Sequence, residues 1–333
     1  MLHIIGKVTV LESVDAPGPT IKYIDQVVRE APDDVVFRYF SWPAALFGTY
    51  DVFHVHWPEF LIRSRWRVVA FARRLLFRLL LVRLRARGTR IVRTIHNLEP
   101  HAEGAPAEAL LLERLDAQIG AWVRINSVTP FPPAGEHYTV LHGSYRKQFA
   151  STVRPPAKKG RILYIGRIEP YKGVEELARV FTEDGVLAAE LRIVGKADDA
   201  MRHSIEAITA TDSRVQCHFE FVSDDRLVAE ISESELVVLP YREMHNSGIA
   251  LIALSLNRPI LVPDTLANAS LSDEVGSEWV IRYRDRISGT VLRDALAKST
   301  GLRDRVPYLD NRDWSQVAEG YAAAFRGAKD ATQ

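Results

Sequence analysis

Cysteine is nearly absent from this chain of 333 residues, because Cys217 is the only one. A single cysteine cannot close an internal disulfide, so a disulfide-stabilised scaffold is excluded and a reducing compartment is expected. We interpret Cys217 as a small apolar residue of the core rather than as a nucleophile. Residues 1–7 carry no basic segment ahead of an apolar core, so no secretory signal is expected.

An excess of either charge is also missing, since 43 Lys and Arg residues face 42 Asp and Glu residues and leave a net charge of +1. The two halves differ, however: residues 1–150 sum to +5 and the remainder to −4. The imbalance is concentrated in residues 60–93, which contain 11 Arg and no acidic residue. The longest uncharged run there is the five residues 68–72, so this stretch cannot span a bilayer, which needs about 20.

Short apolar runs alternate with amphipathic stretches twice, once on each side of a segment rich in Pro and Gly, residues 130–156. This alternation predicts an α/β protein with two Rossmann-like, doubly wound domains that face each other across a cleft at the carboxyl ends of their strands. The domains are placed at residues 1–145 and 146–310, with a C-terminal helix in residues 311–333 that can return to the first domain. The expected strands are residues 2–8, 35–39, 52–56, 90–95, 161–165, 189–194, 217–221, 236–239 and 259–262, and the expected helices are residues 21–29, 108–123, 174–181, 225–231, 249–256 and 314–325.

A short loop with two cations follows the expected strand at residues 161–165. Arg167 and Lys172 lie between Gly166 and Gly173, and Gly173 permits a tight turn into the next helix. Two cations that converge at the carboxyl end of a strand suit a diphosphate, because Arg offers a planar fork and Lys a point charge. The alternative is an ordinary solvated loop.

A second polar loop follows the expected strand at residues 236–239. Asn246 or Ser247 is expected to cap the apolar helix that begins near Ile249. Free backbone N–H groups at that end, with Gly248 allowing close approach, favour an anion-binding site. A capped core helix without a ligand is the alternative reading of the same pattern.

Together these motifs resemble those of the GT-B glycosyltransferases, in particular glycosyltransferase family 4 and the bacterial exopolysaccharide glycosyltransferases. The resemblance rests on the Gly-Arg-x4-Lys-Gly pattern at residues 166–173, on Leu-Arg-Ile-Val-Gly at 191–195, and on the acidic stretch 224–235 followed by the two loops described above. It implies that the second domain binds a nucleotide sugar, with GDP-mannose favoured and a UDP-sugar possible, and that no other cofactor is used. The residues that it assigns to the donor are Gly166, Arg167, Lys172, Asn246, Ser247, Gly248 and Ile249.

The chain also departs from that family. Family 4 enzymes usually carry two Glu residues eight positions apart around the second loop. Here the second position falls on Ile252, which has no carboxylate, and the first falls near Met244, so Glu243 takes that place only if the loop is one residue longer. We therefore carry over Glu243 as a candidate catalytic residue and leave both retention and inversion of the anomeric configuration open. The double glycine of the first domain is represented only by Gly18, a candidate for the acceptor side.

Polar residues follow two strands of the first domain, and in a parallel sheet both ends lie at one edge. An inverting transfer requires a base for the acceptor hydroxyl, whereas in a retaining transfer the leaving phosphate can take the proton. The candidates for that base are Glu59, His96, Glu99 and His101, and the resemblance implies that His96 lies near the reacting sugar. Neither an HExxH nor an Asp-x-Asp motif is present, so no metal is expected. The candidate catalytic residues are Glu59, His96, Glu99 and Glu243. His56 and His101 are assigned to the acceptor side. For each His, the alternative is a hydrogen-bonded residue at a strand end without a catalytic role.

The basic stretch predicts a helix that lies on an anionic membrane surface. Its expected membrane contacts are Arg65, Trp66, Arg73, Arg74, Phe77 and Arg78. The alternative is a crossover helix with solvated Arg side chains, and nucleic acid is not expected as a partner because the protein is near neutral.

The sequence thus predicts a glycosyltransferase that moves a sugar from a nucleotide sugar to a glycan or lipid-linked acceptor. We expect it to be cytoplasmic and peripheral at the inner face of the plasma membrane. A nucleotide-sugar epimerase on the same scaffold and a non-catalytic membrane or carbohydrate-binding protein are the alternatives.

Overall fold

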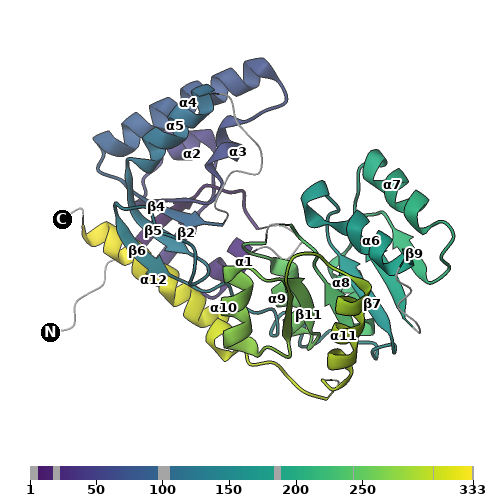
Figure 1. Ribbon diagram of the computed structural model, residues 1–333. Coiled ribbons are helices and arrows are strands. Elements are labelled where there is room, and N and C mark those ends of the chain that lie inside the picture. The colour runs from purple at the N-terminus through teal and green to yellow at the C-terminus, as the bar shows by residue number, and fades with distance from the viewer. Residues whose placement is uncertain are drawn as a thin grey trace. The chain divides into compact units, whose positions relative to one another are not determined.

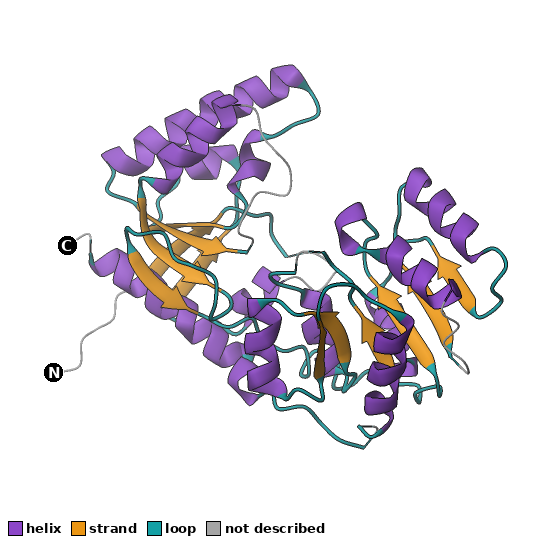
Figure 2. Cartoon of the chain, in the orientation of Figure 1, coloured by secondary structure: helices purple, strands orange, loops and turns teal. Residues whose placement is uncertain are grey.

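The computed structural model describes residues 7–17, 23–96, 106–183, 189–242, 244–302 and 304–331. The chain forms two compact units (Figure 1): Met1–His142 together with Asn311–Gln333, and Gly143–Asp310. Both are α/β units built around a parallel sheet (Figure 2).

The sheet of the first unit has six parallel strands in the order β2-β1-β3-β4-β5-β6. Glu12 at the end of β1 pairs with His54 in β3, and His54 pairs with Val92 in β4. The strands are β1 (Val8–Glu12), β2 (Val35–Arg38), β3 (Val52–Val55), β4 (Arg90–Ile95), β5 (Ile119–Arg124) and β6 (Glu136–Thr139), and the helices are α1 (Tyr23–Arg29), α2 (Trp42–Phe47), α3 (Pro58–Ile62), α4 (Arg67–Ala86), α5 (Pro106–Asp116) and α12 (Trp314–Asp330).

Helices cover both faces of this sheet (Figure 1). On one face α4 buries Phe77, Leu80 and Leu84 in a core that also holds Phe53 and Val55 of β3. Successive residues of a strand point to opposite faces, so His54 points to the other face, where its ring lies 5.3 Å from that of Tyr321 in α12. The C-terminal helix α12 thus forms part of the first unit, and its apolar face covers strands β1 and β3 to β6.

The sheet of the second unit also has six parallel strands, in the order β12-β11-β10-β7-β8-β9. The carboxyl ends of the central strands β7 and β10 lie next to each other, because the two strands pair directly. The strands are β7 (Arg161–Ile165), β8 (Glu190–Val194), β9 (Val215–His218), β10 (Leu236–Val238), β11 (Ile260–Pro263) and β12 (Val280–Tyr283), and the helices are η1 (Pro170–Lys172), α6 (Val174–Glu183), α7 (Asp199–Thr209), α8 (Asp224–Glu233), α9 (Gly248–Ser255), α10 (Leu266–Val275) and α11 (Gly289–Thr300). The short helix η2 (Asp310–Arg312) lies at the boundary, where the chain returns to the first unit.

Two expectations for the first unit were wrong in detail. The first strand was expected at residues 2–8, whereas the described strand β1 extends from Val8 to Glu12; residues 2–6 lie outside the described part of the chain. The helix expected at residues 108–123 ends at Asp116, and residues 119–124 form the interior strand β5. No Gly or Pro separates the two elements, so the apolar pattern continued through the turn. Strands β6 and β12 were not anticipated.

Candidate functional site

The loop between β7 and α6 is shaped by glycine. Gly166 has φ +130 and Gly173 has φ +65, in the left-handed region. A Cβ atom at Gly173 would overlap the carbonyl oxygen of Pro240, which follows β10. Only glycine therefore lets this loop approach the neighbouring one so closely.

Further contacts hold the two polar loops together. The backbone N–H of Arg242 donates to the carbonyl oxygen of Tyr171 over 2.9 Å. The Nζ atom of Lys172 lies 5.4 Å from the centre of the Tyr241 ring, a cation–π distance. The two sequence motifs, which are separated by more than 60 residues in the chain, thus form one continuous surface at the carboxyl edge of the second sheet.

The two cations in this loop differ in their surroundings. The Arg167 side chain is 76% exposed, and its Nε lies 2.9 Å from a carboxylate oxygen of Glu169. Lys172 is half-buried, and burial lowers the pKa of its ammonium group, although Glu169 opposes this effect. An anion bound beside Lys172 would offset that cost, which is the electrostatic behaviour expected of a phosphate-binding lysine.

Helix α9 begins at the same edge. Its N-cap is Ser247, whose Oγ accepts from the backbone N–H of Ala250 at 3.3 Å. Apart from its chain neighbours and its own helix, no described residue has an atom within 4 Å of the position that a Cβ at Gly248 would occupy. The first N–H groups of the helix therefore border open space beside Gly166, whose own Cβ position lies 3.7 Å from Ile249. Asn246 precedes this cap, and Glu243 lies outside the described residues.

In the first unit, side chains from three strands form a buried hydrogen-bonded cluster. The two carboxylate oxygens of Glu12 each lie 2.9 Å from one histidine, Oε1 from Nδ1 of His54 and Oε2 from Nε2 of His56. The other ring nitrogen of His56, Nδ1, lies 2.9 Å from Nε2 of His96. The Nε2 atom of His54 lies 2.8 Å from the hydroxyl of Thr94. We call these five residues the Glu12 cluster.

Burial governs the protonation of this cluster. Burial lowers the pKa of His56 to about 4, even though its bond to Glu12 favours the charged form, and lowers the pKa of His96 well below its usual range. The carboxyl group of Glu12 is also buried, but the neighbouring His54 and His56 lower its pKa to about 2. At neutral pH the cluster therefore holds an ionised carboxylate together with neutral His56 and His96 rings.

Carboxylate and imidazole groups are also metal ligands, and Glu12, His54 and His56 form the one group within the described ranges whose ligand atoms are close enough to share an ion. Here each carboxylate oxygen bonds to a different ring, at a normal hydrogen-bond distance. The observed geometry is thus that of a hydrogen-bonded network.

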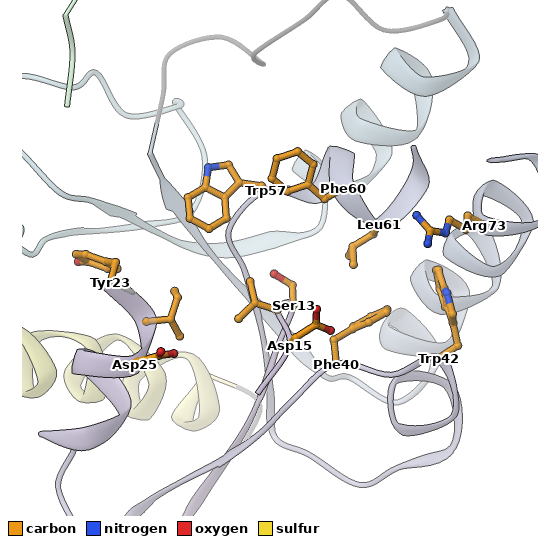
Figure 3. Close-up of a pocket in the computed structure, with 12 residues that line it drawn as sticks. Ser13, Asp15, Tyr23, Asp25, Phe40, Trp42, Trp57, Phe60, Leu61 and Arg73 are labelled. Carbon is orange, nitrogen blue, oxygen red and sulfur yellow. The ribbon is translucent and has the colours of Figure 1, made fainter. Parts of the chain in front are cut away.

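A pocket of about 580 Å³ lies beside the Glu12 cluster, at the carboxyl ends of β1 and β3 (Figure 3). Two of the rings that line it contact His96: the Trp57 ring stacks on the imidazole at 4.2 Å, and the Tyr23 ring meets it edge-on at 5.7 Å. The pocket thus combines aromatic walls with acidic groups. Its lining residues are Ser13, Val14, Asp15, Tyr23, Ile24, Asp25, Phe40, Trp42, Trp57, Phe60, Leu61 and Arg73.

The first-unit residues selected from the sequence are only partly brought together. His96 and His56 belong to the Glu12 cluster, and both are buried rather than set on a surface. Glu59 is buried at the start of α3. Gly18, Glu99 and His101 lie outside the described residues.

Glu12, His54 and Thr94 were not predicted as site residues from the sequence. One signal was available: His54 and His56 alternate along a strand that is otherwise apolar, and polar side chains on one face of a buried strand require partners there. Their main partner, Glu12, was hidden because the first strand was expected to end at residue 8.

The basic stretch forms helix α4, but the membrane contacts expected there need correction. Phe77 is fully buried in the core, so it cannot contact a membrane; Arg73 and Arg74 are half-buried, and Arg73 donates to the carbonyl oxygen of Arg63 at 2.6 Å. Arg65, Trp66 and Arg78 are exposed as expected. An unanticipated row of exposed apolar side chains, spaced three or four residues apart on one face, runs along the helix; this α4 stripe is Val68, Phe71, Leu75, Leu79 and Val82.

Among the described residues, no helix combines the length and the apolar character needed to cross a lipid bilayer.

Two parallel six-stranded sheets with these connections match solved structures of GT-B glycosyltransferases, which confirms the expected fold class. Anabaena HepE in complex with UDP-glucose matches with a TM-score of 0.60, 9% identity and 98% of both chains covered. Sucrose-phosphate synthase from Thermosynechococcus elongatus matches with a TM-score of 0.58 and 16% identity, over 96% of this chain and 95% of that one.

Sequence comparison narrows this class. The family described as glycosyl transferases group 1 matches residues 159–293. A GDP-mannose:glycolipid 4-beta-D-mannosyltransferase from Xanthomonas campestris pv. campestris is 40% identical over 316 residues, which cover 94% of this chain and 90% of that protein. The chain belongs to this family of glycosyltransferases, whose co-substrates are nucleotide sugars. Both the family resemblance and the predicted enzyme class are thus confirmed, over the epimerase and the non-catalytic alternatives.

Proposed function

We propose that the protein transfers mannose from GDP-mannose to a sugar hydroxyl of a glycolipid and forms a β linkage. The 40% identity to the Xanthomonas mannosyltransferase over nearly the whole of both chains carries this proposal. The sugar of GDP-mannose is held in an α linkage to phosphate, so formation of a β-mannoside inverts the anomeric carbon. The proposed reaction is therefore an inverting transfer.

The donor diphosphate would occupy the second unit, where the two polar loops meet. Arg167 and Lys172 supply positive charge, and the first N–H groups of α9, at Gly248 and Ile249, supply hydrogen-bond donors. When the sugar leaves, negative charge builds up on GDP, and fixed cations stabilise that charge in the transition state. Ser247 positions the helix end through its cap.

The acceptor sugar would occupy the pocket of the first unit. Trp42 and Trp57 offer flat apolar faces for a sugar ring, and Asp15 and Asp25 offer acceptors for its hydroxyl groups (Figure 3). His96 lies directly behind Trp57 and is the candidate base for the attacking hydroxyl. In the reaction the acceptor oxygen bonds to the anomeric carbon, the bond from that carbon to the phosphate oxygen breaks, and its electron pair leaves with GDP.

The same reaction scheme needs no metal ion, because protein cations and helix N–H groups take the role of balancing the diphosphate. We propose that transfer is metal-independent, so activity should persist in EDTA. Loss of turnover in EDTA that manganese restores would contradict this part of the proposal.

A glycolipid acceptor places the protein at a membrane surface. The α4 stripe would enter the interface, while Arg67, Arg78 and Arg85, all exposed along the same helix, would meet anionic head groups. The helix contains no acidic residue, which gives it the charge complementary to such a surface. We place this surface at the cytoplasmic face of the membrane, where nucleotide sugars are available.

The deciding experiment measures transfer from radiolabelled GDP-mannose, GDP-glucose, UDP-glucose and UDP-galactose to a membrane glycolipid fraction, with the linkage of the product determined by NMR. Mannose transfer with a β linkage is expected. Transfer only from UDP-sugars would refute the donor, and an α-linked product would refute inversion.

A further inference from the structure

The Glu12 cluster contains a chain of hydrogen bonds whose direction can be worked out. A carboxylate oxygen can only accept, so the Nε2 atom of His56 must carry a hydrogen and donate it to Glu12. A neutral imidazole has no second hydrogen, so the Nδ1 atom of His56 accepts. Its partner at 2.9 Å, the Nε2 atom of His96, must therefore be the donor.

That direction fixes the state of the remaining nitrogen. When Nε2 of a neutral His96 holds the hydrogen, Nδ1 is unprotonated and meets any partner as an acceptor. His56 is neutral because burial lowers its pKa to about 4, even though its bond to Glu12 favours the charged form. Burial is the main cause that lowers the pKa of His96, and the neighbouring His56, His142, His54 and Arg93 act in the same direction.

We propose that Glu12, acting through His56, holds His96 in the tautomer whose Nδ1 atom accepts the proton of the acceptor hydroxyl. This inference rests on the inverting transfer proposed above, which requires such a base. Glu12 and His56 are positioning residues, because they act on the hydroxyl only through His96, whose ring contacts two rings of the pocket wall, Trp57 and Tyr23.

In the reaction the acceptor O–H bond breaks as its oxygen bonds to the anomeric carbon. The proton goes to Nδ1 of His96, the ring becomes an imidazolium, and the electron pair of the broken carbon–phosphate-oxygen bond leaves with GDP. The new positive charge lies at one end of a chain that has the Glu12 carboxylate at the other, so the carboxylate stabilises it in a site with little water. After product release the proton passes to solvent and His96 returns to its neutral form.

Thr94 and His54 form a second branch of the cluster that ends on the same carboxylate. The Thr94 hydroxyl lies 2.8 Å from Nε2 of His54 and 3.0 Å from the Tyr321 hydroxyl, and a hydroxyl both donates and accepts. This branch therefore adapts to either state of His54 and imposes no direction on His96. It supplies a matched control, because a change at Thr94 disturbs the same buried cluster without touching the His56–His96 bond.

The direct test is NMR of the full-length protein with ¹⁵N-labelled histidine rings at pH 7.5, with and without EDTA. His96 signals are assigned from His96→Gln and His56 signals from His56→Gln. In both His96 and His56 we expect Nε2 to be protonated and Nδ1 to be unprotonated. We expect the same protonation of the His96 nitrogens in Thr94→Val. A protonated Nδ1 on His96, a doubly protonated His56, or signals that EDTA shifts because a metal has been removed would overturn the proposal.

Kinetic measurements test whether turnover depends on the tautomer of His96. Glu12→Gln keeps the shape of the side chain but removes its charge and replaces one acceptor by a donor, so His96 is no longer held in one tautomer. We expect kcat to fall by about 100-fold or more, with the Kd for GDP unchanged, since general base catalysis contributes about 10²–10⁴-fold. In the His96→Ala background the same change should cause no further loss, because there is no base left to position.

Equal losses from Glu12→Gln in both backgrounds would show a purely structural role and overturn the inference. The NMR experiment needs no substrate, so it remains decisive if GDP-mannose proves to be the wrong donor. The two failures are therefore distinguishable.

Discussion

Acidification from pH 7 to pH 4.5 should destabilise the first unit, because the buried His56 resists protonation. Burial lowers the pKa of His56 to about 4, whereas in the unfolded chain it returns to about 6.5. Between these values the unfolded chain binds a proton that the native protein does not, so the free energy of unfolding falls as pH falls. At ~1.4 kcal/mol per pH unit, His56 alone lowers the free energy of unfolding by about 3 kcal/mol over the full interval between its two pKa values.

Two neighbours act in the same direction. Burial also lowers the pKa of His96, which increases the loss of stability over the same pH range. The pKa of Glu12 is near 2, so the stability that its ionised carboxylate contributes is lost only below pH 4.5. The expected profile is therefore a decline in stability that begins near pH 6.5 and continues downward. A loss of about 3 kcal/mol is a large share of the roughly 5–15 kcal/mol that stabilises a typical domain.

The assay is urea unfolding of the full chain at pH 7.5, 6.5, 5.5 and 4.5 in the presence of EDTA. Tryptophan fluorescence reports mainly on the first unit, since Trp279 is the only one of six Trp residues in the second. His56→Gln should lower stability at pH 7.5 but flatten the decline. Val55→Ala, which opens a cavity in the same strand on the opposite face, should lower stability equally at every pH.

A stability that is constant between pH 6.5 and 4.5, or that rises on acidification, would refute the assignment of a neutral buried His56. A decline of unchanged slope in His56→Gln would assign the effect to other groups.

The remaining predictions concern the donor loop and the α4 stripe. Lys172→Ala should raise the Kd for GDP at least 10-fold in calorimetry, whereas Arg202→Ala, an exposed cation on α7, should leave it unchanged; equal affinities in both variants would refute the diphosphate site. Gly173→Ala should destabilise the second unit by about 1–3 kcal/mol in urea unfolding, because the residue has φ +65 and its Cβ would overlap Pro240; a loss within error would contradict this. Phe71→Glu should reduce co-sedimentation with phosphatidylglycerol vesicles several-fold, while Phe221→Glu, an equally exposed aromatic residue of the second unit, should not; equal binding of all forms, or equal binding to phosphatidylcholine vesicles, would remove the membrane proposal.

The donor loops were predictable from the sequence because each is a local feature. A strand, a short polar loop and a capped helix are contiguous in the chain, so Ser247 as a cap and Gly173 as a tight turn follow from residue type. Their meeting at one edge follows from the rule that parallel strands present their carboxyl ends together. Only the closeness of the contact, through Gly173 and Pro240, required the structure.

The Glu12 cluster could not be predicted in the same way, because it depends on strand order and register. Glu12, His56 and His96 lie at the ends of three strands, with more than 40 positions between the first two. No local pattern indicates that β1 is placed between β2 and β3. A shift of two residues in the pairing of β1 with β3 would separate the carboxylate from both rings. The periodicity of apolar residues predicts that a strand is buried, but it does not identify the strands that pair with it.

The location of the cluster argues against a purely structural role. Buried charges seldom add net stability, and apolar residues of similar volume often serve as well or better. Elsewhere on the sheet this chain uses such residues: Phe53 and Val55 of the same strand face the α4 side and belong to an apolar core. On the opposite face of β3, at its carboxyl end, the chain instead places the polar cluster, which leads through His96 to the aromatic wall of the pocket. The cluster lowers the stability of the fold in mild acid, yet it fixes which nitrogen of His96 accepts a proton. Such a cluster is expected at a site of proton transfer rather than in a purely structural part of the sheet.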